Sequence, residues 1–213
     1  MELEFFGGNC FRIKTKNTTI VVDDNLDVIG SKSIQNEKTV GFYTSDITYD
    51  EKAAEHSRLV IRTAGEFEVG DITVHGVQAR SHMDEEGNHS AQVFQFMHSG
   101  QTITVLGHIH PEISDEVTEL ISGTDVLVVP VGGNGYTLDP IGAASIIKKA
   151  EPGIIIPSHY HIAGMSYEVP ALPIDEFAKV MSVNLDNEQQ SLKLEKSAEE
   201  ISAQARVVVL KKN

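Results

Sequence analysis

Imidazole groups are the main candidates for chemistry in this chain. Nine histidines occur in its 213 residues, and four of them form the pairs His108-Ile109-His110 and His159-Tyr160-His161. Alternate residues of a strand point to the same side, so each pair can present two ring nitrogens to a metal ion. The alternative is that both pairs only fill a polar rim at a strand end. Cys10 lies among apolar residues and is predicted to be a small packed thiol.

A glycine-rich segment is the second candidate for chemistry. The stretch 132-GGNGYTLDP-140 leads into a helix that is predicted to begin with Asp139 as N-cap and Pro140 as its first residue. Its glycines permit close backbone approach, and the free N–H groups of the helix favour a small anionic molecule. The residues expected to contact that molecule are Gly133, Asn134, Tyr136 and Thr137. A tight turn before a capped helix explains the same segment without a ligand.

Strand patterns dominate the first half of the chain. Segments rich in Val, Ile, Thr and Phe are separated by Gly, Asn, Asp or Ser, and several connections are short enough for hairpins. This pattern predicts a mainly antiparallel sheet. The predicted strands are 2–6, 10–15, 18–24, 39–44, 72–79, 91–97 and 101–107.

The second half alternates between helix and strand. Helices are predicted at 114–122, 139–150 and 174–181, and strands at 125–130, 153–158 and 206–211. The apolar residues of 125–130 are continuous, which indicates a buried strand. In the helix 139–150, the stripe expected to pack on a sheet consists of Ile141, Ala144, Ile147 and Ala150. The polar segment 186–204 is predicted to be a surface loop or a hairpin at a sheet edge.

Taken together, these elements predict one α/β domain over residues 1–213, with two mixed sheets packed face to face and helices outside. The formal charge of −14 disfavours nucleic acid and anionic lipid as partners, and no apolar run is long enough for a membrane helix. With one cysteine and no targeting segment, the sequence favours a cytoplasmic location. Assembly into a homo-oligomer stays open.

Several motifs, in this order along the chain, resemble the metallo-β-lactamase superfamily, in particular its ascorbate-6-phosphate-lactonase-like branch of small hydrolases. The matching segments are 3-LEFFGGNCFRI-13, 20-IVVDD-24, 65-GEFEVGDITVHGV-77, 129-VPVGGNGYTLDP-140 and 154-IIIPSHY-160. The resemblance implies a four-layer αββα sandwich with one or two metal ions, often zinc or manganese, at one edge of the sheets.

The sequence departs from this family where the metal ligands are expected. Active members carry Thr-His-x-His-x-Asp-His after the strand that here ends at Thr44, whereas this chain has Ser45, Ile47, Tyr49 and Asp50 at the ligand positions. Of these four, only Asp50 is a good metal ligand. The aspartate that bridges two metals in the family is replaced by His108. The usual two-metal site is therefore not expected.

The resemblance still places three histidines at one sheet edge. His82 and His159 match the family's middle and last metal-binding histidines, and His108 would join them. Three imidazoles with an open fourth position can hold one zinc or manganese ion and activate a water. Asp50 and His89 are the candidate catalytic groups, as base and proton shuttle.

Three functions remain open at this point. The first is a metal-dependent hydrolase that cleaves a small ester, lactone or phosphoester at an altered, single-metal site. The second is a catalytically inactive member of the fold that binds a small ligand and no metal. The third is a structural partner or interaction subunit without a ligand.

Overall fold

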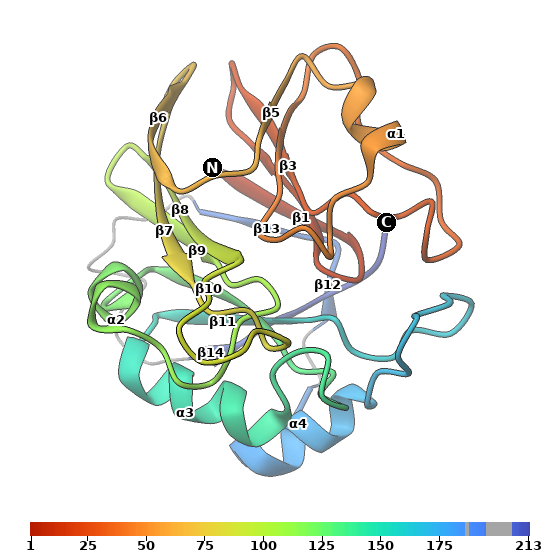
Figure 1. Cartoon of the computed structure of the whole chain (residues 1–213), viewed down its shortest axis with the longest axis vertical. Helices are drawn as coiled ribbons and strands as arrows, with labels where there is room; N and C mark the ends of the chain where they lie inside the picture. The colour runs from red at the N-terminus through yellow and green to blue at the C-terminus, as the bar shows by residue number, and fades with distance from the viewer. Residues whose placement is uncertain (186–187, 195–205) are drawn as a thin grey trace.

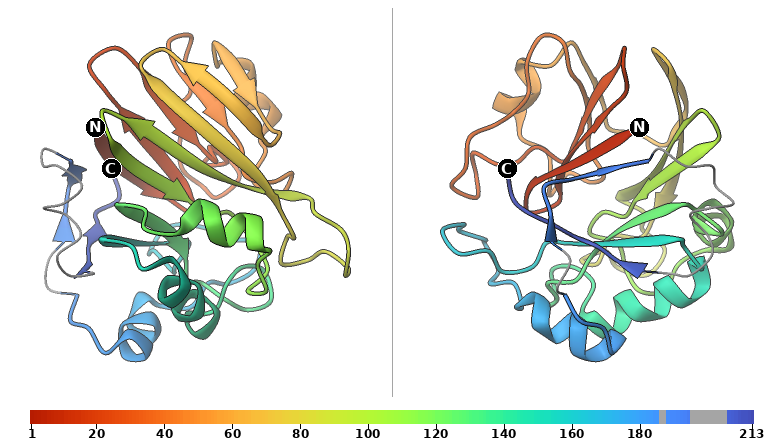
Figure 2. Two further views of the ribbon diagram at one scale, coloured as in Figure 1. Left: turned by 90° about the vertical axis from the view of Figure 1, so that its left-hand side faces the viewer. Right: turned by 180° about the vertical axis from the view of Figure 1, so that it is seen from behind.

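Two stacked β-sheets form the centre of the molecule, and helices lie outside them (Figures 1 and 2). This computed structural model describes residues 1–185, 188–194 and 206–213. The predicted α/β fold with two mixed sheets is confirmed.

The first sheet has six strands in the order β13-β1-β2-β3-β4-β5. They are β1 (Glu2–Gly7), β2 (Cys10–Lys14), β3 (Thr19–Val22), β4 (Val40–Phe42), β5 (Leu59–Ile61) and β13 (Ser191–Lys193). β1, β2 and β3 are antiparallel neighbours, whereas β4 pairs in parallel with both β3 and β5. The expected antiparallel order is therefore wrong at this edge, because the long connections before and after β4 allow the chain to cross over.

The second sheet has seven strands in the order β14-β11-β10-β9-β8-β7-β6. They are β6 (Gly65–Val69), β7 (Ile72–Ala79), β8 (Ala91–His98), β9 (Gln101–Val105), β10 (Val126–Pro130), β11 (Ile154–Ser158) and β14 (Arg206–Val207). β9, β10 and β11 run parallel, and β10 and β11 are buried along their whole length, as their continuous apolar residues indicate.

The C-terminal strands differ from the prediction. Instead of one strand at 206–211, β14 pairs with β11, and β15 (Val209–Leu210) pairs with β12 (Glu188–Gln189) in a separate two-stranded sheet. The predicted loop or hairpin at 186–204 includes β12 and β13. Within that segment, 186–187 and 195–204 lie outside the described residues.

Four helices complete the described fold. They are α1 (Glu51–Glu55), α2 (Asp115–Ile121), α3 (Pro140–Ala150) and α4 (Ile174–Met181). α2, α3 and α4 lie on the side of the seven-stranded sheet, and α1 lies on the side of the six-stranded sheet (Figure 1). Asp139 caps α3 as predicted, because its Oδ1 accepts a hydrogen bond from Gly142 N at 2.7 Å.

The predicted packing stripe of α3 is partly wrong. Ile147 and Ala150 are buried, but Ile141 is 69% exposed. The buried face instead contains Ala143 and Ile146. Ile141 and Ala150 are nine residues apart, and at about 100° per residue they point to opposite sides of the helix.

Aromatic residues join the two sheets at the centre of the core. Phe42 from β4 meets Phe94 and Phe96 from β8 edge to face, with ring centroids 5.1 and 5.2 Å apart. Edge-to-face pairs place the positive ring edge against the negative ring face, which adds to the burial of their apolar area. The stacking of the two sheets therefore rests on well-ordered ring contacts.

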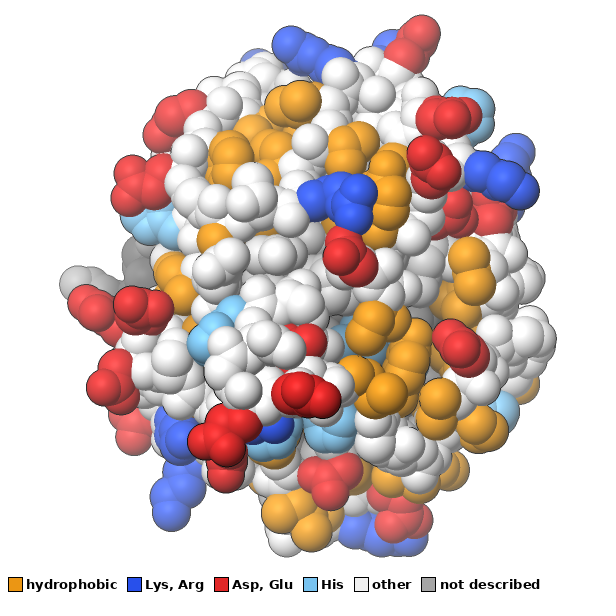
Figure 3. Space-filling model, viewed as in Figure 1, with side chains coloured by type: hydrophobic (Ala, Val, Ile, Leu, Met, Phe, Trp, Pro, Cys, Tyr) orange, Lys and Arg blue, Asp and Glu red, His pale blue; other side chains and the backbone are white. Residues whose placement is uncertain are grey.

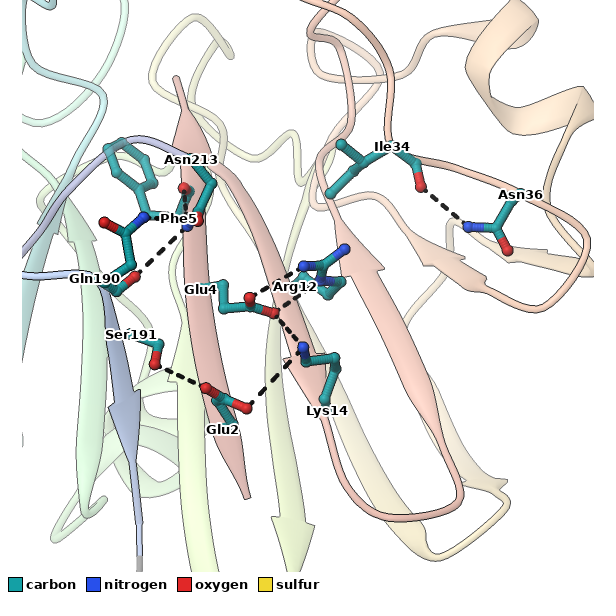
Figure 4. A network of polar contacts seen from close by, with 10 residues as sticks. All are labelled: Glu2, Glu4, Phe5, Arg12, Lys14, Ile34, Asn36, Gln190, Ser191 and Asn213. Atoms are coloured by element: carbon teal, nitrogen blue, oxygen red, sulfur yellow. Dashed lines mark hydrogen bonds and ion pairs between the residues drawn. The ribbon is translucent and has the colours of Figure 1, made fainter.

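Charged side chains of β1 and β2 form a network on the six-stranded sheet (Figure 4). Glu4 on β1 accepts two hydrogen bonds from Arg12 on β2, at 2.8 and 3.0 Å, and also pairs with Lys14 at 2.8 Å. Glu2 accepts a hydrogen bond from Ser191 on β13 at 2.7 Å. These contacts support the register of β13, β1 and β2, although such partly exposed pairs contribute little stability.

The hairpin β6–β7 forms one edge of the seven-stranded sheet. β6, like α1 and β5, was not predicted as a separate element. Glu66 and Glu68 of β6 are exposed, whereas Val69 is buried. This alternation places one face of the edge strand against the core and the other in water.

A buried carboxylate, Asp23, connects the strand ends at one edge of the two sheets. Its Oδ1 accepts hydrogen bonds from Thr44 N and Thr48 Oγ1, and its Oδ2 accepts from Thr44 Oγ1 and Asn9 Nδ2, each at 2.7 Å. Asn9 also donates to Leu106 O at 3.1 Å and accepts from Ser158 Oγ at 2.6 Å. Burial raises the pKa of Asp23, and the hydrogen bonds counteract that shift.

We expect Thr48→Val to lower the free energy of unfolding by about 1–3 kcal/mol, because it removes one donor from a buried carboxylate. Urea unfolding at pH 7 measures the change. Thr63→Val, the same substitution at an exposed position, is the control and should change stability by less than about 0.5 kcal/mol. Equal effects of the two substitutions would contradict a stabilising role of the network.

Candidate functional site

Three histidines follow alternate strands of the seven-stranded sheet, β7, β9 and β11, with β8 and β10 between them. His82 comes after β7, His108 after β9 and His159 directly after β11. The rings of His108 and His159 meet edge to face, with centroids 4.6 Å apart and an interplanar angle of 85°. His82 N donates a hydrogen bond to His108 O at 2.7 Å. The structure therefore brings the three residues together, and only two of their rings contact each other directly.

The pair His108 and His159 is buried and uncharged. Their exposed fractions are 1% and 5%. Burial, followed by the nearby His159 and His82, holds the pKa of His108 well below its usual value. Burial lowers the pKa of His159 to about 4. Neither ring nitrogen of His108 has a hydrogen-bond partner in the described protein, and Nδ1 of His159 has none either.

The geometry does not fit a metal centre. Across residues 1–185, 188–194 and 206–213, no group of three or more His, Cys, Asp or Glu side chains is placed to hold a metal ion. His82, the expected third ligand, lies beside the ring of His110, with centroids 5.9 Å apart. A catalytic zinc needs three protein ligands around one point. Metal binding by His82, His108 and His159 therefore stays a prediction that this arrangement does not support.

The segment that replaces the family's ligand motif is built into the fold. Asp50 is the N-cap of α1, since its Oδ1 accepts hydrogen bonds from Lys52 N and Ala53 N. Tyr49 packs edge to face on Tyr43, and the guanidinium of Arg62 lies 3.6 Å from its ring centroid. The backbone around Asp50 thus has a structural explanation, and its catalytic role stays a prediction.

The glycine-rich loop packs directly against the buried pair. A Cβ at Gly132 would lie 2.0 Å from His159 O, so only glycine permits this approach. The ring of Tyr136 lies 5.0 Å from that of His108, and the ring of Tyr167 lies 5.1 Å from that of His159. Thr137 is buried, and its Oγ1 has no partner in the described protein. Of the residues predicted to contact a ligand, Tyr136 thus packs on His108, and Thr137 follows it in the chain.

Gly133 and Asn134 have a different place in this loop. Both have positive φ, 66° and 59°, which gives the loop its sharp turn. The side-chain amide of Asn134 donates to Pro170 O and ties the loop to the segment that carries Tyr167. Their predicted contact with a ligand is not tested by these bonds.

A cavity of about 240 Å³ lies at His110, whose ring is next to that of His82. It is lined by Ala79, Arg80, His89, His110, Glu112, Ile113, Ser114 and Val117. His89, one of the predicted catalytic groups, therefore lines this cavity and has no recorded contact with His108 or His159. In Figure 3, histidine side chains reach the surface of this face among acidic groups and an apolar patch.

Sequence reasoning missed several residues of this region. Arg80 and Tyr167 belong to no recognisable motif, and only the fold places them near the histidines. Asp23 had a signal, since this polar residue directly follows the apolar strand segment that ends at Val22.

The family profile described as "Beta-lactamase superfamily domain" matches residues 2–159, which is most of the chain. The chain belongs to the metallo-β-lactamase superfamily. This result confirms the family that the motifs indicated. No curated protein sequence matches the chain.

Several solved structures share the fold. A proposed Zn-dependent hydrolase from Thermotoga maritima has a TM-score of 0.70 at 24% identity, covering 98% of this chain and 97% of that one. An isothiocyanate hydrolase from Delia radicum gut bacteria has a TM-score of 0.66 at 12% identity, covering 100% and 97%. A proposed metal-dependent hydrolase from Parabacteroides distasonis has a TM-score of 0.60 at 13% identity, covering 96% and 91%. Within the described residues, no helix is long and apolar enough to cross a membrane.

We expect stability to fall on acidification because of His159. Its pKa is about 4 in the folded protein and about 6.5 in the unfolded chain, so the unfolded state gains a proton first as the pH falls. The stabilisation from the neutral ring is complete above about pH 6.5 and is lost towards pH 4. At pH 5 the loss from this one group is about 2 kcal/mol.

Urea unfolding of His159→Asn at pH 7 and pH 5 tests this expectation. Asparagine tolerates the positive φ of 49° at this position and does not titrate. The variant should lose about 2 kcal/mol less than the parent between the two pH values. The exposed His161 gives the control His161→Asn, which should behave like the parent. An unchanged pH dependence in His159→Asn would refute the assignment.

Proposed function

We propose that this chain is a metal-free member of the metallo-β-lactamase superfamily that binds a small polar molecule at His108, His159 and Thr137. The observation that carries the proposal is that buried polar atoms without partners occur in these three side chains, of which His108 and His159 are in ring contact and Thr137 follows Tyr136, which packs on His108. A buried polar atom without a hydrogen bond costs about 1–3 kcal/mol, so such a group is retained where a bound molecule pairs with it.

The chemistry of these side chains defines what they recognise. A neutral imidazole has one N–H donor and one acceptor nitrogen, and the threonine hydroxyl can do either. A ligand with hydroxyl, carbonyl or amide groups matches this set. Tyr136 and Tyr167 pack against the two imidazoles and are themselves partly exposed, so both lie between the pair and solvent. Binding therefore requires at least one tyrosine to move.

A single-metal hydrolase of a small ester, lactone or phosphoester is the second candidate. The ring nitrogens of His82, His108 and His159 that lack partners favour it, since zinc or manganese would satisfy them. Two of the similar structures are proposed metal-dependent hydrolases, which is further support. The motifs at 65–77 and 129–140 favour the ascorbate-6-phosphate-lactonase-like branch for either function. Self-assembly and an interaction role stay predictions.

Metal analysis separates the two candidates. We expect protein purified without chelator to contain less than about a tenth of an equivalent of zinc or manganese, and EDTA to leave the melting temperature unchanged. A metal that binds only the folded state would raise that temperature when added. Elemental analysis and thermal melting measure both quantities. Stoichiometric zinc, removed by EDTA with a loss of stability, would replace the first candidate by the second.

We expect His108→Phe to raise the free energy of unfolding by about 1–3 kcal/mol at pH 7, because it removes two buried nitrogens without partners and keeps a ring against Tyr136. The same variant should lose the melting shifts that a panel of lactones, hydroxy acids and phosphate esters produces in the parent. His161→Phe, at an exposed position two residues after His159, is the control that keeps those shifts. A destabilised His108→Phe protein would show that His108 serves packing.

A further inference from the structure

We propose that Arg80, His89 and His110 form a subsite for an anionic group, a carboxylate or a phosphate, of the molecule bound beside His108. The inference rests on the proposed function, because His110 in the cavity lining lies beside His82, whose backbone N–H is bonded to His108 O. The cavity lining combines polar residues, Arg80, His89 and His110 with Glu112 and Ser114, and the apolar residues Ala79, Ile113 and Val117. Such a mixed lining fits a small molecule that has one charged end.

Arg80 is held in place by an uncharged partner. Its Nε and Nη2 donate to the backbone oxygen of Asp84 at 3.2 and 3.0 Å, which fixes the plane of the guanidinium. The carboxylate of Asp84 accepts hydrogen bonds from Ser81 N, Ser90 N and Ser90 Oγ, at 2.7 to 2.8 Å. The carboxylate of Asp84 is therefore bonded within its own loop and does not pair with Arg80. The guanidinium of Arg80 keeps the capacity to bind an anion.

Glu112 is the counter-ion that an incoming anion would displace. Its carboxylate lies 3.8 Å from Nη1 of Arg80 and 3.9 Å from Nδ1 of His110, beyond ordinary hydrogen-bond length. The side chain is 83% exposed, so it can move into solvent at little cost. A ligand carboxylate bound by two guanidinium N–H groups would gain contacts that Glu112 does not make.

The backbone determines which nitrogen of His110 carries the proton. Glu112 N donates a hydrogen bond to Nδ1 of His110 at 3.1 Å, so the neutral ring carries its proton on Nε2. Nε2 is then a donor suited to an anionic or carbonyl oxygen. The ring of His110 also lies beside that of His82, 5.9 Å away, and His82 is bonded through its backbone to His108. A ligand in the cavity would thus contact His110, which is linked to His108 through His82.

The charge of the whole chain opposes this anion at long range. The formal charge is −14, but at physiological salt the screening length is about 8 Å, so the contact with Arg80 decides the affinity. The site is therefore expected to bind simple anions weakly, in the millimolar range, and an extended ligand more tightly.

Histidine ring NMR of the full chain tests the subsite with acetate, inorganic phosphate and acetamide, the uncharged isostere of acetate. Acetate and phosphate should shift the ring signals of His110 and His89, and acetamide should not. Arg80→Gln should weaken acetate binding at least about tenfold, since it removes a charge-assisted bond. Glu112→Gln, at an exposed position that does not endanger folding, should strengthen it several-fold.

The outcomes separate the subsite from the proposed function. No shift of His110 with either anion, or equal affinity in the parent, Arg80→Gln and Glu112→Gln, would overturn the subsite. If uncharged polar compounds still shift the rings of His108 and His159, the proposed function survives that result. If acetate and phosphate bind as expected but no compound of the lactone and phosphate ester panel reaches His108 or His159, the anion site stands without the proposed function.

Discussion

The carboxylate of Asp23 is the interaction on which the arrangement of the strand ends depends. It is fully buried, and an unpaired charge at this place would cost several kcal/mol. Four hydrogen bonds from Asn9, Thr44 and Thr48 make the burial tolerable, and they bring together segments that are far apart in the sequence. Through Asn9, the network extends to Leu106 O and Ser158. His159 follows Ser158 directly, so one carboxylate influences where the candidate site lies.

This network occupies the region where the superfamily resemblance led us to expect metal ligands. A metal ion draws ligands from several strands to one point, and here hydrogen bonds among Asn9, Asp23 and Thr48 join the strand ends. The side chains at the site are then not needed to bind a metal and can be uncharged. His108 and His159 lose their charge through burial, and Tyr136 and Tyr167 pack against them. The fold is kept while the chemistry at its edge changes.

The sequence predicted those parts of the fold that rest on local signals. The continuous apolar residues of β10 and β11 and the Asp139-Pro140 start of α3 were recognised because each pattern is produced within a few residues. Parallel pairing of β3, β4 and β5 depends on partners distant in sequence, and α1, five residues long, is too short for a periodic pattern. These elements could not be recognised from local patterns.

For the candidate site, the family resemblance supplied the neighbourhood of His82, His108 and His159, and spacing alone could not have done so. The direction of each histidine ring could not be predicted from the sequence, because it depends on contacts with Tyr136, Tyr167 and His110. The hydrogen bonds of Asp23 join residues up to 25 positions away, so its role could not be distinguished from turn capping. Whether these histidines form a metal site or an uncharged cluster depends on the direction of their side chains more than on the order of the strands.

The edge strand β6 has a consequence for how copies of the chain meet in concentrated solution. The outer side of an edge strand offers a row of N–H and C=O groups that could continue the sheet into another molecule. Glu66 and Glu68 place like charges along that row. Two copies approaching edge to edge would bring these carboxylates together, so growth of the sheet by strand addition is opposed by repulsion.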